Sequence, residues 1–320
     1  MTRVPRGPGP AGLPVSGGGL LLADKGEGVT SFQVVAHVRR VLRAAKVGHG
    51  GTLDPMATGL LPLLLGEATK LTAYVQGHDK EYVATVRLGV ATDTLDATGT
   101  VTRERPVPPL EAGDLAAALA RFVGEIEQVP PMFSALHAGG RRLHELARAG
   151  VEVDRPPRRV RVHALELLEW APPRLRLRVA CSSGTYVRSL AADLGDALGC
   201  GGHVQALVRT RLGPFALADA VPSAVLQAGD PAVLAARILP ADRAVAHLPA
   251  VRLSPGAARR IATGQGVPGG EVEPPPAGEP RPCRLYVGET FLGVGELSAT
   301  GVRPLRLLHA DRPGPGPLPG

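Results

Sequence analysis

The alternating run "RLRLRVA" at residues 174–180 constrains the fold more than any other feature of this 320-residue chain. Leu175, Leu177 and Val179 point to one side, and the arginines between them point to the other. Alternation with a period of two is typical of a β-strand. The segment "EYVATVRLG" at residues 81–89 repeats this pattern. The chain is therefore expected to build a β-sheet.

Helical spacing of apolar residues between such segments adds α-helices to the expected fold. Helices are predicted over Ser31–Ala45, 114–124 and 188–199, further strands over Leu20–Ala23 and 158–170, and a loop over 46–59. The very apolar segment 59–75 is predicted to enter the core and to be helical toward its end. Because strands and helices do not alternate in a regular β-α-β rhythm, we expect an α+β fold around a mixed or antiparallel sheet.

A change in composition between Pro240 and Pro249 indicates a domain boundary. The chain is predicted to divide into a catalytic domain over 19–245 and a small β-rich domain over 249–310, whose short strands are interrupted by a loop at 268–282. Proline and glycine dominate both chain ends, so 1–18 is predicted to be a disordered leader and 311–320 a disordered tail.

The composition limits the classes of protein to which the chain can belong. With 44% hydrophobic residues it can bury a core, and no uninterrupted apolar run reaches the roughly 18 residues of a membrane-spanning helix. Its three cysteines are widely spaced, which favours neither a disulfide framework nor a zinc site and fits a reducing cytoplasm. A net charge of +7 favours a polyanionic partner such as nucleic acid.

The segment "GHGGTLDPMATG" at residues 48–59 surrounds one carboxylate, Asp54, with glycines and small residues. An aspartate before a proline is most often a turn residue. Two other segments carry side chains capable of chemistry. "DKEYVATVRLGVATDTLDATG" holds Tyr82 and Asp96, and "CSSGTYVRSLAADLG" holds Tyr186 and Arg188 at a junction between a strand and a helix.

Taken together, "KVGHGGTLDPMATGLLPLLLGEATK" and "CSSGTYVRSLAADLG" resemble the TruB-type tRNA pseudouridine-55 synthases of bacteria. The resemblance extends from about Leu20 to Phe215 and keeps the order and spacing of the motifs. It implies a pseudouridine synthase catalytic domain, and the C-terminal segment is similar to a small PUA-like domain. One departure is Gly26, where the family usually has proline, which loosens a turn near the site.

The resemblance implies a reaction that needs a single carboxylate. A uridine in the tRNA T-loop is cut at its N-glycosidic bond, the base turns over, and C5 is joined to C1′. No atom is gained or lost, so no cofactor and no metal are expected. The family pattern makes Asp54 the catalytic carboxylate, either as nucleophile at C1′ or as base at the 2′ carbon, and both routes stay open. Arg188 would pair with it and keep it ionised, and Tyr82 would stack on the flipped uracil and help to deprotonate C5.

The same resemblance implies further contacts with the RNA. The residues expected to bind substrate are His49, Tyr186, Leu207, Lys25 and Asp96. Seven arginines fall within 141–161. An isolated run of this kind would usually be a solvated surface, but the family places a mobile RNA-binding thumb over about 130–160. Arg141, Arg142 and Arg148 would bind phosphates there.

The sequence is thus interpreted as a standalone cytoplasmic tRNA pseudouridine synthase, an isomerase that works as a monomer without an obligatory protein partner. Three alternatives stay open: a guide-RNA-dependent synthase subunit, a non-catalytic RNA-binding or RNA-folding protein, and a nucleoside-cleaving hydrolase. Modification of a bare tRNA transcript would separate the first two from the main hypothesis, and release of free uracil would support the third.

Overall fold

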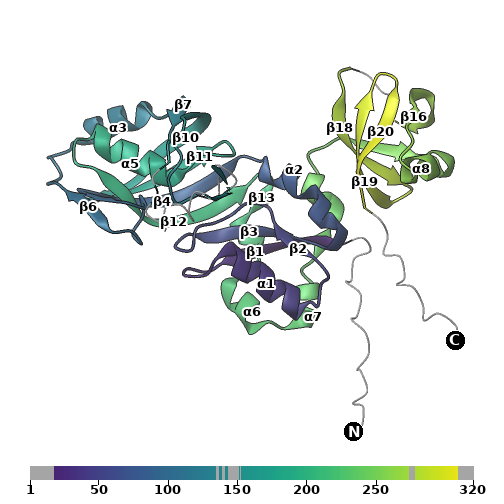
Figure 1. Cartoon of the computed structure of the whole chain (residues 1–320), viewed down its shortest axis with the longest axis horizontal. Helices are drawn as coiled ribbons and strands as arrows, with labels where there is room; N and C mark the ends of the chain where they lie inside the picture. The colour runs from purple at the N-terminus through teal and green to yellow at the C-terminus, as the bar shows by residue number, and fades with distance from the viewer. Residues whose placement is uncertain are drawn as a thin grey trace, which may run out of the picture.

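The computed structural model describes residues 18–134, 137–138, 141–142, 151, 153–273 and 278–308. Figure 1 shows a larger body built on one long sheet and, beside it, a smaller module formed by the C-terminal part of the chain. The predicted leader, apart from Gly18, and the predicted tail lie outside the described residues. The model therefore tests neither of these two predictions.

Ten strands form the sheet of the larger body. The main path runs β14 (Leu239–Pro240), β1 (Gly19–Lys25), β3 (Thr58–Leu65), β12 (Gly202–Leu212), β4 (Lys80–Leu88), β11 (Arg174–Cys181), β10 (Arg158–Ala171) and β7 (Gly124–Gln128), with β2 (Val47–His49) beside β3 and β13 (Phe215–Ala216) beside β12. Only β3 and β12 pair in parallel among the named strand pairs of this described sheet. The predicted α+β fold around a mixed sheet is confirmed.

One face of this sheet is covered by α1 (Ser31–Val41), α3 (Ala112–Ala120), α5 (Val187–Ala197), α6 (Ser223–Ala228) and α7 (Pro231–Ala235). The short helix α2 (Thr72–Gln76) packs on the other face. The period-two prediction for β11 is confirmed, because Leu175 and Val179 are fully buried in the cluster that holds Leu190 of α5. Arg174 and Arg176, which alternate with these apolar residues, are exposed on the opposite face.

Three predicted segments of the larger body differ from the structure. The first helix ends at Val41 instead of Ala45, because Arg43 takes a φ of +49°, which a helix cannot continue. Residues 47–49 form β2 instead of loop, since they pair with β3. The segment 59–75 begins with strand β3, which is buried on both faces and so shows no alternation, before the 3₁₀ turn Gly66–Leu71 and the predicted helical end.

The C-terminal module is a six-stranded sheet with one helix. Its order is β16 (Val267–Pro268), β20 (Gly301–Leu307), β19 (Thr290–Ser298), β18 (Arg281–Val287), β15 (Ala250–Leu253) and β17 (Val272–Glu273). The helix α8 (Pro255–Ala262) lies in the part of the chain for which only short strands were predicted. Ser254 caps it by accepting a hydrogen bond from Ala257 N at 3.2 Å, and Pro255 fits its first turn. The predicted loop 268–282 contains β17, a short 3₁₀ turn and the first residues of β18.

The module packs against the larger body. Val294 belongs to the same buried cluster as Leu71 and Val245. Tyr286 Oη donates to Asp242 Oδ2 at 2.7 Å, and this hydrogen bond joins the two parts. The division into domains at about 245–249 stays a prediction. Within the described residues, no helix is long and apolar enough to cross a membrane.

Candidate active site

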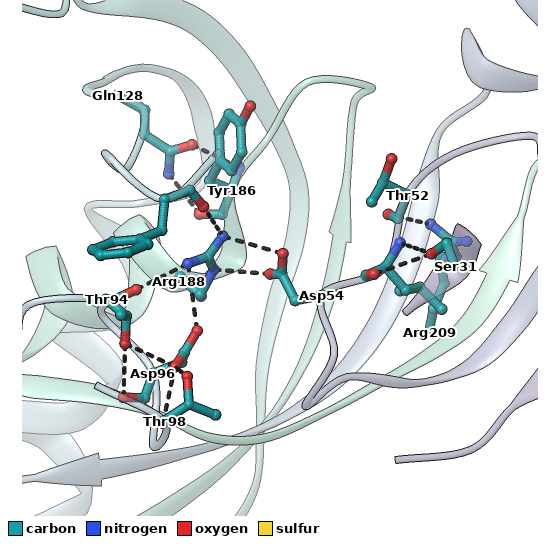
Figure 2. A network of polar contacts seen from close by, with 12 residues as sticks. Ser31, Thr52, Asp54, Thr94, Asp96, Thr98, Gln128, Tyr186, Arg188 and Arg209 are labelled. Carbon is teal, nitrogen blue, oxygen red and sulfur yellow. Dashed lines mark hydrogen bonds and ion pairs between the residues drawn. The ribbon is translucent and has the colours of Figure 1, made fainter. Parts of the chain in front are cut away.

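The loop that carries Asp54 connects β2 to β3 and is held from one side by Arg209. This arginine lies on β12 with its side chain fully buried. Its guanidinium donates to Gly51 O at 3.0 Å, to Thr52 O at 3.4 Å and to Leu60 O at 2.7 Å. It therefore fixes the backbone on both sides of Asp54, as Figure 2 shows in part.

Two residues near the N-terminus also hold this loop. Ser31 Oγ accepts from Leu53 N at 2.9 Å and donates to Leu53 O at 3.1 Å. Lys25, only 1% exposed, donates to Gly26 O at 2.9 Å, to Val29 O at 2.7 Å and to Pro55 O at 3.2 Å. Burial lowers the pKa of Lys25 to about 8. The predicted supporting residue Lys25 thus lies directly behind the Asp54 loop.

Arg188 lies in the first turn of α5 and contacts Asp54 through two nitrogens. Its Nε lies 2.9 Å from Asp54 Oδ2, and a terminal nitrogen donates to Oδ1 at 3.2 Å. Such a two-point contact fixes the plane of the carboxylate as well as its position. Figure 2 shows the guanidinium at the centre of the network, where it also donates to Phe133 O at 2.7 Å and to Thr94 O at 2.9 Å.

Asp96 holds Arg188 from the side away from Asp54. Its Oδ2 accepts from Arg188 at 3.3 Å. Its Oδ1 accepts from Thr94 Oγ1 at 2.8 Å, from Thr98 Oγ1 at 2.6 Å and from Thr98 N at 3.0 Å. Both Arg188 and Asp96 have side chains only 5% exposed, whereas the Asp54 side chain is 34% exposed. Asp54 is therefore the member of this trio that can reach a ligand.

The electrostatic environment of Asp54 contains opposing effects. Burial raises the pKa of its carboxyl, and the nearby charge of Asp96 raises it further, while Arg188 and Lys25 lower it. The net direction is upward from the ordinary value. Arg188 is the largest influence that favours the ionised form.

A cavity of about 300 Å³ opens in front of Asp54. Tyr82 from β4 and Leu207 from β12 line it, and both are less than 10% exposed. Tyr186 lines it from the residue before α5, where its backbone N–H donates to Gln128 Oε1 at 2.7 Å and its carbonyl accepts from Gln128 Nε2 at 3.0 Å. Burial raises the pKa of both tyrosines.

The structure thus brings most of the sequence-predicted residues to one place. Asp54, Tyr82, Arg188, Tyr186 and Leu207 line the cavity. Lys25 and Asp96 stand behind it, through their contacts with the Asp54 loop and Arg188.

Of the remaining predicted residues, only His49 has a described side chain, and it does not line this cavity. His49, on β2, accepts from Gly51 N at 3.4 Å. The backbone of Arg141 and Arg142 forms strand β9, which pairs with β8 (His137–Ala138), but their side chains are not described, and Arg148 lies outside the described residues.

Sequence reasoning assigned no role to Arg209, Lys80 or Gln128. Arg209 left a signal, because it follows Leu207 by two residues in a strand and so shares its inward face; a charged residue in phase with the core is unusual. Gln128 left none, since its contact with Tyr186 spans 58 residues. Within the described residues no group of three or more His, Cys, Asp or Glu side chains could hold a metal. The three cysteines are free and buried.

Three family models match successive parts of the chain. TruB family pseudouridylate synthase (N terminal domain) matches 39–187, tRNA pseudouridylate synthase B C-terminal domain matches 188–246, and Pseudouridine synthase II TruB, C-terminal matches 249–308.

Curated proteins give the same family, and a solved structure shares the fold. The chain is 47% identical over 290 residues to tRNA pseudouridine synthase B of Azoarcus sp. (strain BH72), covering 91% of this chain and 94% of that protein. It is 49% identical to the Thiobacillus denitrificans protein of the same name, covering 91% and 95%. A chain in the crystal structure of the archaeal box H/ACA sRNP Nop10-Cbf5 complex matches with a TM-score of 0.69 at 25% identity, covering 91% of this chain and 86% of that one. The chain therefore belongs to the TruB family of pseudouridylate synthases.

Proposed function

We propose that this enzyme isomerises uridine to pseudouridine in tRNA, at position 55 of the T-loop, with Asp54 as the catalytic carboxylate. The observation that carries the proposal is the placement of Asp54, which faces the cavity and is gripped at both oxygens by Arg188. The substrate class is supported by relatives at 47% and 49% identity that are named tRNA pseudouridine synthase B.

The reaction rearranges bonds within one nucleotide. The bond from N1 of uracil to C1′ breaks, the base turns within the cavity, and a bond from C5 to C1′ forms. The hydrogen on C5 leaves as a proton, and N1 gains one, so the overall balance is zero. The protein must therefore act on the sugar, hold the detached base and move one proton.

One exposed carboxylate suffices for the step on the sugar. A retaining glycosidase places two carboxyl groups about 5 Å apart so that one protonates the leaving group. Here the second acid, Asp96, is 5% exposed and is saturated by Arg188 and two threonines, so it cannot reach the substrate. Asp54 acts alone, either on C1′ as nucleophile or on the 2′ carbon as base.

The walls of the cavity suit a base removed from its stack. Extruding a nucleotide costs a few kcal/mol, and stacking on an aromatic ring returns about 1–3 kcal/mol. Tyr82 supplies such a ring, and Leu207 and Tyr186 supply further contact surface. The thumb arginines Arg141, Arg142 and Arg148 are proposed to bind phosphates outside the cavity.

The pKa of Asp54 determines how the reaction rate depends on pH. The carboxyl must be ionised, and its pKa is raised above the ordinary value by burial. The active form is therefore populated above that raised pKa and lost as the pH falls through it. Arg188 keeps the ionised form available at neutral pH.

The test uses the purified chain and an unmodified tRNA transcript with no other component. Pseudouridine mapped at nucleotide resolution to the T-loop uridine would support the proposal. Conversion only after adding a guide RNA and partner proteins would favour the guided alternative, to which the likeness to the H/ACA structure points. Free uracil in the supernatant would identify a hydrolase, and binding without any conversion would leave a non-catalytic RNA-binding protein.

A further inference from the structure

Lys80 enters the same cavity from the first position of β4 and has no role in the chemistry described above. It precedes Tyr82 by two residues and lines the cavity with it. Its Nζ donates to Gln76 O at 3.0 Å and to His78 O at 2.7 Å. An ammonium group has three N–H donors, so one is left to point at a ligand.

Lys80 and Arg209 form a pair of like charges around Gly51. A Cβ atom built on Gly51 would lie 3.5 Å from an Arg209 terminal nitrogen and 3.9 Å from Lys80 Cε. Lys80 donates to carbonyl oxygens, and Arg209 donates to carbonyl oxygens and forms a side-chain hydrogen bond with Tyr82. Within the described residues, neither side chain forms an ion pair with a carboxylate. The adjacent acid, Asp79, pairs instead with His163 Nε2 at 3.0 Å.

The charge around the cavity is therefore unbalanced. Arg188 is shared by Asp54 and Asp96. Among the residues that line the cavity, Arg188, Lys80 and Arg209 are three cations against the single carboxylate of Asp54. Two partly or fully buried cations of like sign repel each other, and an anion between or beside them would relieve that repulsion.

We propose that Lys80, backed by Arg209, is the binding site for one backbone phosphate that flanks the flipped nucleotide. The inference rests on the proposed function, because it takes the RNA as the source of the anion. A compact ammonium with a spare donor binds phosphate as a point charge. Asp54 would contact the sugar and Tyr82 the base, and Lys80 would fix the phosphate of the same substrate.

The proposal predicts a pH dependence of RNA binding with a definite sign. Burial and the charge of Arg209 lower the pKa of Lys80 to about 8, and the charge of Asp79 acts in the opposite direction. Cys181 would act like Asp79 only when ionised, and burial raises its own pKa to about 11. His78 lies two residues before Lys80. Its pKa is lowered mainly by burial, so its ring is neutral near pH 8 and adds no charge. A phosphate would raise the Lys80 pKa in the complex. The contribution of Lys80 is thus complete below about pH 8 and is lost as the pH rises through the raised value.

The experiment measures the affinity of a T-arm hairpin RNA in the Asp54→Asn background, so that chemistry does not intervene. Lys80→Met and Lys80→Arg are compared with the control Lys70→Met, whose lysine is held by Glu67 and Leu307 O away from the cavity. We expect Lys80→Met to weaken binding about 5- to 20-fold at pH 7 and to lower the salt slope by about 1. Lys80→Arg should bind tightly and keep its affinity up to pH 9.

Chemically modified RNA identifies which phosphate Lys80 contacts. Hairpins carry a neutral methylphosphonate at the phosphate on the 5′ or the 3′ side of the target uridine. One of the two should weaken binding to the Lys80-containing protein about as much as Lys80→Met does, with no further loss when both changes are combined. Additive losses at both positions, or an unchanged salt slope in a folded Lys80→Met protein, would overturn the proposal.

The controls separate this proposal from the proposed function. Thermal unfolding shows whether Lys80→Met is folded, and if it is not, the pH profile of Lys80→Arg against the parent decides the question alone. A chain that binds as predicted but makes no pseudouridine refutes the function and keeps the phosphate site. If the chain makes pseudouridine but substitution of Lys80 does not change RNA binding, the phosphate site is refuted and the proposed function is kept.

Discussion

Removing the guanidinium of Arg188 should leave the Asp54 carboxylate unpaired and no longer fixed in position. In Arg188→Met the carboxylate loses two charged hydrogen bonds, at 2.9 and 3.2 Å. Each such bond contributes about 1.5–3 kcal/mol. Because the Asp54 side chain is 34% exposed, water replaces part of this, and we take about 3–4 kcal/mol as the net loss. At about 1.4 kcal/mol per factor of ten, isomerisation should slow by about 100- to 1,000-fold.

The assay is a single-turnover measurement of tritium release from tRNA labelled at C5 of uridine, between pH 6 and pH 9. Losing Arg188 raises the pKa of Asp54 further, so the residual rate of the variant should climb with pH over a more alkaline range than in the parent protein. The matched control is Arg161→Met, whose arginine pairs with Glu125 on the exposed sheet face. A rate for Arg188→Met within about threefold of the parent, or an unshifted pH profile, would refute the reasoning.

Three further changes test the framework of the site and the fold. Asp96→Asn leaves Arg188 with less neutralising charge, so the free energy of unfolding should fall by about 1–3 kcal/mol, and single-turnover rates should fall at unchanged tRNA affinity. Gly59→Ala places a Cβ 2.5 Å from Arg209 O at a φ of +97°, and denaturant titration should show a loss of about 2 kcal/mol or more, whereas Gly113→Ala, open in α3, should gain about 0.5–1 kcal/mol. Tyr286→Phe removes the hydrogen bond to Asp242 and should cost about 1 kcal/mol in calorimetry with unchanged turnover. Unchanged stability of Asp96→Asn or Gly59→Ala, or lost turnover in Tyr286→Phe, would contradict the contacts described.

Local patterns predicted the parts of the fold that have one buried and one exposed face. Strands β11 and β4 and helix α5 each pack on the core with one face. Their apolar residues therefore recur with a period that can be recognised in the sequence. Strand β3 escaped this reasoning. It packs on α1 with Leu61 and Leu63 and on the 3₁₀ turns with Leu60 and Leu64, so its sequence is apolar throughout.

Only the site residues that lie in the family motifs could be predicted from the sequence. Asp54 and Arg188 are 134 residues apart, and nothing in their spacing shows that they meet. The resemblance to a known family supplied that pairing. The buried clamp by Arg209 and the unpaired charge of Lys80 depend on how β12, β4 and the Asp54 loop come together in three dimensions, so no single segment reveals them.

The central claim is that the carboxylate of Asp54 acts on the ribose of the target uridine. The most direct measurement is the single-turnover rate of Asp54→Asn on unmodified tRNA, taken together with its tRNA affinity. The isosteric amide can still occupy the cavity but cannot act as nucleophile or base, so we predict no detectable pseudouridine with affinity within a few-fold of the parent. Conversion by Asp54→Asn at a rate near that of the parent would contradict the account.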